Sequence, residues 1–351
     1  MTSTSAGRIV VGVLYPPKWY RDQAAFAAAL DAICALDDRI DVVVETYVED
    51  PARRIGPDAR HAATDLPPPP EISAAMRDAF AQLDIAVAID LPDDLAELAP
   101  RLEWVQAVGA GVNHLERTVA RSGARLTSNG GSNAIGIAEF VFGRILEHWK
   151  DFAVLADSQQ AHRWYPHFGR QLSGCTLGLL GFGAINQAVA RRAAAFGMRT
   201  VVMRRNPSLA TEGVDEVVGE DGLAGLLGAS DVVVAAMPET ARTTGMMGRE
   251  QFAAMKPGAF FCNVGRGSLV DELALRDALV SGHLGGAAID VAVAEPLPSD
   301  DPLWDAPNLR ISAHCSTVPA AMFPTLHRTF LDNLRRYLAG EPLLNEVLVE
   351  Q

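Results

Sequence analysis

Short apolar runs alternate along the chain with longer stretches that have helical periodicity. Val, Ile, Leu and Ala dominate these runs. Continuous apolar runs between helical stretches are typical of parallel strands that are buried on both faces. The pattern therefore predicts an α/β architecture with right-handed crossovers. The expected strands are Ile9–Leu14, Val42–Thr46, Ile85–Ile89, Leu102–Val108, Thr176–Leu180, Thr200–Met203, Val232–Met237, Ala259–Val264, Gly286–Val291 and Leu309–Ser312.

About ten strands are too many for one small doubly wound sheet, so we expect two doubly wound parallel-sheet domains with a cleft between them. Two long helices, Ile135–Ser158 and Pro319–Leu338, do not fit inside a compact βα repeat. We interpret both as connections between the domains. One domain would comprise residues 1–133 plus 319–351, and the other would comprise residues 134–318.

The composition is typical of an ordinary soluble protein with a sizeable core, since 49% of the 351 residues are apolar and 21% are charged. The formal net charge of −13 argues against a nucleic-acid binder, which needs a basic face. The most apolar stretch, Ala134–Leu146, contains Glu139 and Arg144 and is too short to cross a bilayer. Met1–Arg8 lacks an apolar segment, so we expect no signal peptide.

The cysteines are widely spaced and include no CxxC pair. We therefore expect free thiols, no metal site and a cytoplasmic location, where the environment is reducing. The four residues are Cys34, Cys175, Cys262 and Cys315.

A glycine-containing turn follows the expected strand Thr176–Leu180 and precedes a helical stretch. Gly181 permits a tight turn, and Gly183 lets the backbone approach a pyrophosphate at the helix N-terminus. Asn186 occupies the sixth position of this GxGxxG-like motif, where glycine normally permits close helix–strand packing. We therefore expect the helix to lie slightly further from the strand. A plain βα turn without a ligand is the alternative interpretation.

Two arginines, Arg204 and Arg205, follow the next expected strand. In an NAD site, an acidic residue about 20 residues after the glycines usually accepts the ribose hydroxyls. Guanidinium groups instead match a 2′-phosphate in charge and geometry. The pair favours NADP(H), while NAD(H) stays open, and two solvated surface arginines are the alternative.

Polar side chains follow three later expected strands. Arg266 follows Ala259–Val264, Asp290 and then Glu295 come at and after the end of Gly286–Val291, and His314 follows Leu309–Ser312. Ligands bind beyond the carboxyl ends of the strands in open α/β sheets. The sequence therefore predicts that one cation, two carboxylates and one histidine converge on one edge of a sheet.

These residues belong to stretches that resemble the D-isomer-specific 2-hydroxyacid dehydrogenases. The resemblance is strongest from Leu172 to Ser316 and loose over the first 100 residues, and the paired arginines are most similar to those of the NADPH-using glyoxylate/hydroxypyruvate reductases. In the loop Gln106–His114, Asn113 stands where the family has Asp. The motifs that carry the resemblance are Gln106–His114, Pro238–Thr243, Met255–Asp271, Ala288–Leu297, Pro302–Trp304, Pro307–Asn308 and His314.

The resemblance implies a Rossmann cofactor domain in the middle of the chain, a flavodoxin-like substrate domain and a set of residue roles. His314 would protonate the substrate carbonyl, Glu295 would accept its other ring proton, and Arg266 would bind the substrate carboxylate. The backbone at Ala110 and Gly111 would hold that carboxylate as well. The implied cofactor-binding residues are Gly181, Gly183, Ala184, Ile185, Arg204, Arg205, Pro238, Thr243, Val264 and Asp290.

The implied activity is NAD(P)H-dependent reduction of a small 2-oxo acid, similar to glyoxylate or hydroxypyruvate, to the D-2-hydroxy acid. A non-catalytic cofactor-binding scaffold or regulator of the same fold is the alternative. NAD-linked phosphoglycerate or phosphite oxidation fits the Arg, Glu and His set but not Arg204 and Arg205. The partners would be a small-molecule substrate and a second copy of the chain, paired through the helix Ile135–Ser158, with no nucleic acid and no membrane. Trp164, Tyr165 and His167 would line the substrate pocket or pack at an interface.

Overall fold

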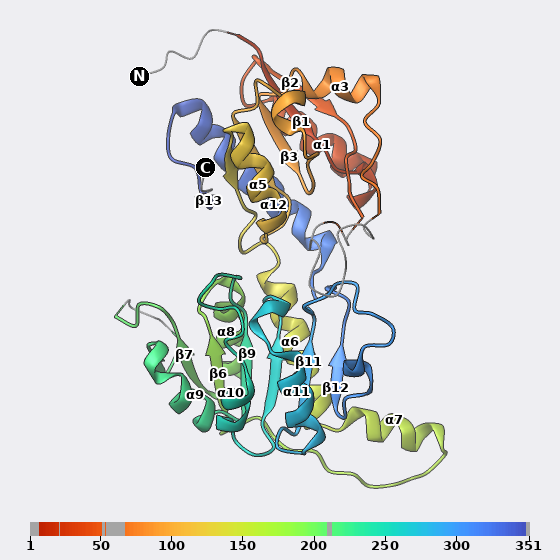
Figure 1. Ribbon diagram of the computed structural model, residues 1–351, viewed down its shortest axis with the longest axis vertical. Coiled ribbons are helices and arrows are strands. Elements are labelled where there is room, and N and C mark those ends of the chain that lie inside the picture. The colour runs from red at the N-terminus through yellow and green to blue at the C-terminus, as the bar shows by residue number, and fades with distance from the viewer. Residues whose placement is uncertain (1–6, 21, 51–52, 54–66, 209–212, 349–351) are drawn as a thin grey trace. The chain divides into compact units, whose positions relative to one another are not determined.

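The computed structural model divides the chain into two compact units (Figure 1). Unit 1 consists of Met1–Ser132 with Pro319–Gln351, and unit 2 consists of Asn133–Val318. The residues that the structure describes are 7–20, 22–50, 53, 67–208 and 213–348.

Unit 1 is built on a six-stranded sheet, sheet A, with the strand order β13-β5-β4-β3-β1-β2. Its strands pair in parallel except β13, which is antiparallel to β5. The order reverses between β1 and β3, and ligands bind at such a switch point in open α/β sheets. The elements are β1 (Ile9–Val13), η1 (Pro17–Trp19), α1 (Gln23–Cys34), β2 (Ile40–Val44), α3 (Ala74–Phe80), β3 (Ile85–Ala88), α4 (Leu95–Leu98), β4 (Trp104–Ala107), α5 (Asn113–Ser122), β5 (Arg125–Thr127), α12 (Pro319–Ala339) and β13 (Glu346–Val347).

Both faces of sheet A are buried, because alternate side chains of its strands enter two separate clusters. Val11 and Trp104 pack with residues of α1 and α12, such as Phe330, whereas Val10 and Val105 pack with residues of α3 and α5. This two-sided burial explains why the strands read as continuous apolar runs in the sequence.

Unit 2 is built on a seven-stranded parallel sheet, sheet B, with the order β12-β11-β10-β9-β6-β7-β8. Its order reverses between β6 and β9. The elements are α6 (Ala134–Trp149), α7 (Phe152–Gln160), β6 (Thr176–Leu180), α8 (Ala184–Ala195), β7 (Arg199–Met203), β8 (Glu216–Val218), η3 (Glu220–Gly222), α9 (Leu223–Ala229), β9 (Val232–Ala235), α10 (Arg249–Ala254), β10 (Phe260–Asn263), η4 (Gly267–Leu269), α11 (Glu272–Val280), β11 (Gly286–Ile289), η5 (Pro302–Asp305) and β12 (Leu309–Ile311).

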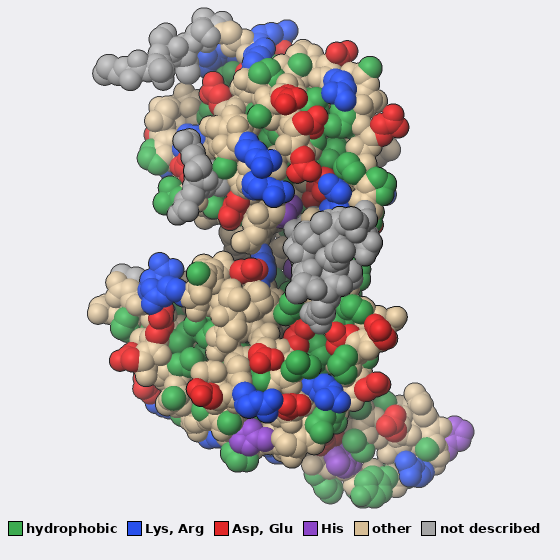
Figure 2. Space-filling view, in the orientation of Figure 1, with side chains coloured by type: hydrophobic (Ala, Val, Ile, Leu, Met, Phe, Trp, Pro, Cys, Tyr) green, Lys and Arg blue, Asp and Glu red, His purple; other side chains and the backbone are tan. Residues whose placement is uncertain are grey.

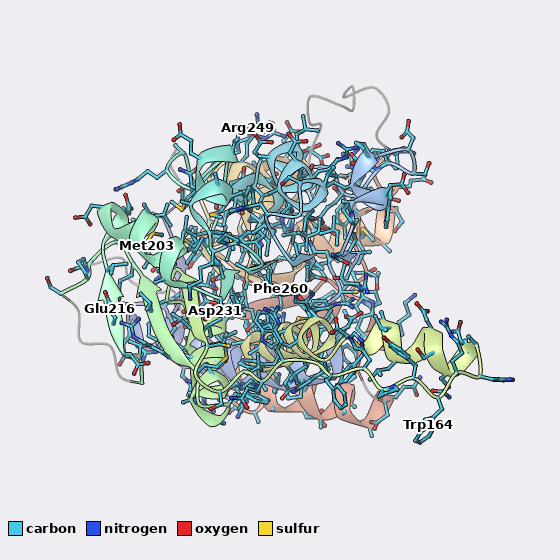
Figure 3. All side chains as sticks on the ribbon, turned by 90° about the horizontal axis from the view of Figure 1, so that it is seen from below. Trp164, Met203, Glu216, Asp231, Arg249 and Phe260 are labelled. Atoms are coloured by element: carbon cyan, nitrogen blue, oxygen red, sulfur yellow. The ribbon has the colours of Figure 1, made fainter. Side chains whose placement is uncertain are left out.

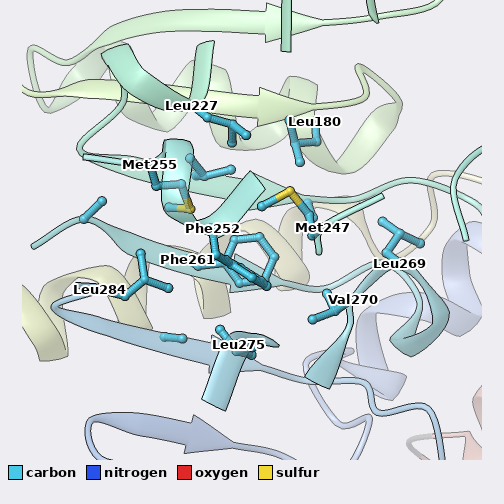
Figure 4. Close-up of a cluster of buried hydrophobic side chains, with 14 of the residues drawn as sticks. Leu180, Leu227, Met247, Phe252, Met255, Phe261, Leu269, Val270, Leu275 and Leu284 are labelled. Atoms are coloured by element: carbon cyan, nitrogen blue, oxygen red, sulfur yellow. The ribbon is translucent and has the colours of Figure 1, made fainter. Parts of the chain in front are cut away.

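Sheet B is also covered on both faces. Figure 4 shows the cluster on one face, where Phe252 of α10 meets Phe261 of β10 edge-on at a centroid distance of 5.3 Å. Helices α9 and α11 contribute to the same cluster, for example through Leu227 and Leu275. The neighbouring Phe260 points to the opposite face, where α6 and α8 pack. The expected fold class, two doubly wound parallel-sheet domains, is confirmed.

The expected single helix Ile135–Ser158 is wrong, because the chain breaks it into α6 and α7. Asp151 adopts a left-handed backbone with φ +50°. The carbonyl of Trp149 accepts the Arg170 N–H at 2.7 Å, and the Asp151 carboxylate lies 2.8 Å from Nε2 of His167. The segment that contains Arg170 therefore hydrogen-bonds to a carbonyl that would accept an intrahelical N–H in a continuous helix.

Acidic and basic side chains are interspersed on the face of the molecule drawn in Figure 2. None of the helices among the described residues is long and apolar enough to cross a membrane.

Candidate active site

The turn after β6 is built for close approach by a ligand. Gly181 has φ +83°, and a Cβ there would lie 2.7 Å from Cγ of Met237, so only glycine fits. At Gly183 an added Cβ would meet nothing within 4 Å, which leaves open space over the backbone. Gly183 is the N-cap of α8 and has no capping side chain, and the first-turn N–H groups of a helix lack intrahelical acceptors. The turn therefore fits a pyrophosphate.

Ala184 and Ile185 are the first two residues of α8, so their N–H groups belong to this set. The Gly181 N–H donates to the carbonyl of Met203 at 2.9 Å, which ties the turn to the last residue of β7. Arg204 and Arg205 follow immediately. Arg204 is half-buried and Arg205 is exposed. The structure thus brings both arginines next to the glycine turn.

The segment after β9 forms a closed turn at the same edge of sheet B. The Thr243 hydroxyl donates to the carbonyl of Pro238 at 2.7 Å and accepts the Thr240 N–H at 2.9 Å. Pro238 is exposed and Thr243 is half-buried. Because β9 lies beside β6, this turn neighbours the glycine turn.

His314 and Glu295 form a direct pair. Nδ1 of His314 donates to Oε2 of Glu295 at 2.8 Å, while Oε1 of Glu295 accepts the Ala292 N–H at 3.0 Å. The hydrogen bond that His314 donates to Glu295 raises the pKa of His314, and the charges of Glu295 and Asp290 act in the same direction. Burial and the charge of Arg266 oppose this rise in the His314 pKa. The pairing leaves Nε2 of His314 as the ring atom that can exchange a proton with a substrate.

Asp290 holds the loop that carries His314. Its buried carboxylate accepts the Ser312 hydroxyl at 2.6 Å, the Cys315 N–H at 3.0 Å and the Ser316 N–H at 3.1 Å. Its carbonyl accepts the His314 N–H at 2.8 Å. These bonds hold His314 at φ +50°, a left-handed conformation that non-glycine residues rarely adopt.

Arg266 follows β10, the strand beside β11 in sheet B. Its backbone carbonyl accepts from the Asn263 side chain at 2.9 Å, and the Asn263 carboxamide oxygen accepts the Gly265 N–H at 3.0 Å. Val264 lies between Asn263 and Gly265 in the chain and is buried. Its N–H donates to the carbonyl of Ala235 in β9. Adjacent parallel strands β10, β11 and β12 thus bring Arg266, Asp290, Glu295 and His314 to one edge.

Ala110 and Gly111 lie in unit 1, in the loop between β4 and α5. Sequence reasoning missed Asn129, which fastens this loop. The buried Asn129 side chain donates to the carbonyl of Val108 at 3.0 Å, and its N–H donates to Gly109 at 2.9 Å. The only sequence signal was the run of turn residues Ser128–Asn133, which gives no indication of this partner.

Trp164 and Tyr165 are exposed in the segment after α7, and Figure 3 shows Trp164 on its outer side. His167 of the same segment is held by Asp151. Among the described residues, no group of three or more His, Cys, Asp or Glu side chains is arranged to hold a metal ion.

The family model described as the D-isomer specific 2-hydroxyacid dehydrogenase, NAD binding domain, matches residues 142–316 of the sequence. Glyoxylate/hydroxypyruvate reductase B of Pectobacterium carotovorum is 33% identical over 257 residues, which cover 71% of this chain and 79% of that protein. The chain belongs to the D-isomer-specific 2-hydroxyacid dehydrogenase family. Its resemblance to this family of NAD(P)-dependent enzymes is thereby confirmed.

Two further similar proteins show how far the likeness extends along the chain. D-3-phosphoglycerate dehydrogenase of Mycobacterium leprae is 28% identical over 90% of this chain, but the match spans only 60% of that longer protein. The structure of an NADPH-dependent glyoxylate/hydroxypyruvate reductase from Sinorhizobium meliloti, in complex with NADP and sulfate, has a TM-score of 0.75 and 26% identity. That match covers 97% of this chain and 98% of the other.

Proposed function

We propose that this protein reduces a small 2-oxo acid to the corresponding D-2-hydroxy acid, with NADPH as the preferred hydride donor. The observation that carries the proposal is the Glu295–His314 pair at the edge of sheet B where Arg266 also lies. A proton donor, its partner carboxylate and a guanidinium group are the groups that reduction of a 2-oxo acid requires.

Each residue has a role that its geometry supports. When bound, NADPH would supply the hydride for the carbonyl carbon of the substrate. His314 transfers the proton from Nε2 to the carbonyl oxygen, and Glu295 stabilises the imidazolium form that precedes the transfer. Arg266 would bind the substrate carboxylate and polarise the carbonyl, and the backbone N–H groups at Ala110 and Gly111 are proposed as further substrate-binding groups.

The dinucleotide-binding domain would comprise residues 134–318, and residues 1–133 plus 319–351 would form the substrate domain. The pyrophosphate would lie against Gly181, Gly183 and the first turn of α8. Arg204 and Arg205 support NADPH over NADH. They directly follow Met203, whose carbonyl accepts the Gly181 N–H of the glycine turn, and guanidinium groups at this position suit the 2′-phosphate of NADPH. The nicotinamide carboxamide would be bound by Val264 and Asp290, with Pro238 and Thr243 beside the cofactor.

A substrate similar to glyoxylate or hydroxypyruvate is supported by the names of the Pectobacterium and Sinorhizobium relatives, both of which are glyoxylate/hydroxypyruvate reductases. The paired arginines disfavour the NAD-linked alternatives. The experiment that tests the activity is a panel of 2-oxo acids offered with NADPH and with NADH, followed by the absorbance of the reduced nicotinamide. Absence of turnover with every 2-oxo acid, despite cofactor binding, would instead favour a non-catalytic scaffold.

The protein would act as a homodimer joined through the region of α6, α7 and the segment after them. Large apolar side chains of this region are exposed in the isolated chain, including Phe152 at 51%, Trp164 at 102% and Phe168 at 88%. Exposed aromatic groups concentrated on one segment are typical of a surface that another protein covers.

A further inference from the structure

Asn186 departs from the glycine expected at the sixth position of the cofactor motif, and the structure gives it a specific set of contacts. Its side chain is fully buried at the third position of α8. Nδ2 donates to the carbonyl of Leu180 at 2.9 Å and to the carbonyl of Gly181 at 2.8 Å. The side chain therefore reaches back from the helix to the start of the glycine turn.

The orientation of this amide is fixed by the two carbonyls, since only the NH2 end can donate to them. Oδ1 then points elsewhere, and none of the described residues donates to it. A buried acceptor without a partner is unfavourable for the stability of the fold. Leu180 does not depend on Asn186, because its carbonyl also accepts the Ala236 N–H at 3.2 Å.

Gly181 is the residue whose geometry depends on the Asn186 amide. In a trans peptide, the C=O of one residue and the N–H of the next point in opposite directions. Because the Gly181 carbonyl points to the buried Nδ2, the Phe182 N–H must point away from it. The amide thus sets the direction of a backbone donor in the turn.

We propose that Asn186 is a positioning residue for the cofactor: its buried amide orients the Gly181–Phe182 peptide so that the Phe182 N–H faces the pyrophosphate. This role rests on the proposed function, in which the glycine turn binds NADP(H). The close packing that a glycine normally permits at this position is replaced by a side chain that links helix α8 to the turn.

The test measures the affinity of the cofactor-free protein for NADP⁺ by titration calorimetry, in wild type and in two variants. Asn186→Ala removes both hydrogen bonds, and we expect the Kd to rise about fivefold, which corresponds to about 1 kcal/mol for the loss of the bond to the Gly181 carbonyl. Asn186→Asp keeps the size of the side chain but loses both donors, and we expect a larger rise. The thermal midpoint of the cofactor-free Ala variant should change little, because the unpaired Oδ1 disappears together with the two bonds.

Two controls separate positioning from a general structural effect. Gln187→Ala removes an exposed side chain whose Nε2 donates to the Phe182 carbonyl at 3.2 Å, and we expect the Kd to change less than about twofold. Adenosine 2′-phosphate, which lacks the pyrophosphate, should bind the Asn186 variants as well as it binds wild type.

The possible outcomes distinguish the two proposals. If wild type binds NADP⁺ and both Asn186 variants bind it equally well, the role of Asn186 is refuted while the proposed function stands. Equal losses of affinity for NADP⁺ and for adenosine 2′-phosphate would also refute it. A wild-type protein that binds neither NADP⁺ nor NAD⁺ would overturn the proposed function and this inference together.

Discussion

Glu295 holds His314 with one carboxylate oxygen and its own loop with the other. Oε2 accepts from Nδ1 of His314 at 2.8 Å, and Oε1 accepts the Ala292 N–H at 3.0 Å. The carboxylate is therefore oriented from both sides, and the imidazole ring is fixed by a group that cannot rotate freely. The Glu295 side chain is 19% exposed and that of His314 is 48% exposed, so the ring stays open to a substrate.

Replacing His314 by alanine removes the proposed proton donor. We expect kcat for the best 2-oxo acid to fall by about 10²–10⁴, the range that general acid catalysis contributes. The affinity for NADPH should be unchanged, which a binding titration of the same protein preparation would establish. A variant with near-normal kcat would contradict the assignment of His314.

The pH dependence of the reaction should report the Glu295–His314 pair. Proton donation requires protonated His314, so the rate of reduction falls as the pH rises through its pKa. Glu295 raises that pKa. In Glu295→Gln the carboxylate charge is lost, the pKa falls, and the alkaline limb of kcat/KM should begin at lower pH than in wild type. Identical profiles for the two proteins would argue against the pairing.

Cofactor preference should depend on Arg204 and Arg205. A charged hydrogen bond contributes roughly 1.5–3 kcal/mol, which corresponds to a preference for NADPH of roughly tenfold to a hundredfold. Arg205 is exposed, so screening by solvent places the expected value in the lower half of that range. The double variant Arg204→Ala with Arg205→Ala should raise the KM for NADPH and leave that for NADH nearly unchanged. Equal kcat/KM with both cofactors in wild type would refute the prediction.

The exposed aromatic side chains after α7 should decide the oligomeric state. We expect wild type to elute from a size-exclusion column with the mass of a dimer, as measured by light scattering. Trp164→Ser with Phe168→Ser should shift the protein toward the monomer, because both side chains are almost fully exposed in the isolated chain. Leu273→Ser, at a position 65% exposed on α11, is the matched control and should stay dimeric. A monomeric wild type would contradict the proposed interface.

The sequence by itself determined where the main strands lie and which side chains follow them. Each of the ten expected apolar runs overlaps a strand, for example β6 at Thr176–Leu180, because burial on both faces leaves a continuous local signal. The sequence also predicted that four polar residues lie at one edge of the sheet, because parallel strands end on the same side. These residues are Arg266, Asp290, Glu295 and His314.

Only the tertiary structure decided the contacts between residues that are distant in the chain. The break between α6 and α7 depends on Arg170 reaching the carbonyl of Trp149, and β13 exists because Val347 pairs with Leu126. The short strands β5, β8 and β13 were not predicted, since two or three residues carry no periodicity.

The same limit applied to the site. Asn186 differs from the motif in a way that the sequence records, but its two hydrogen bonds appear only when the helix folds back on the turn. Likewise, Asn129 fastens the loop of Ala110 and Gly111 from a different strand end. Local pattern follows from burial and backbone geometry, whereas the partner of a buried polar group depends on which segments the complete fold brings together.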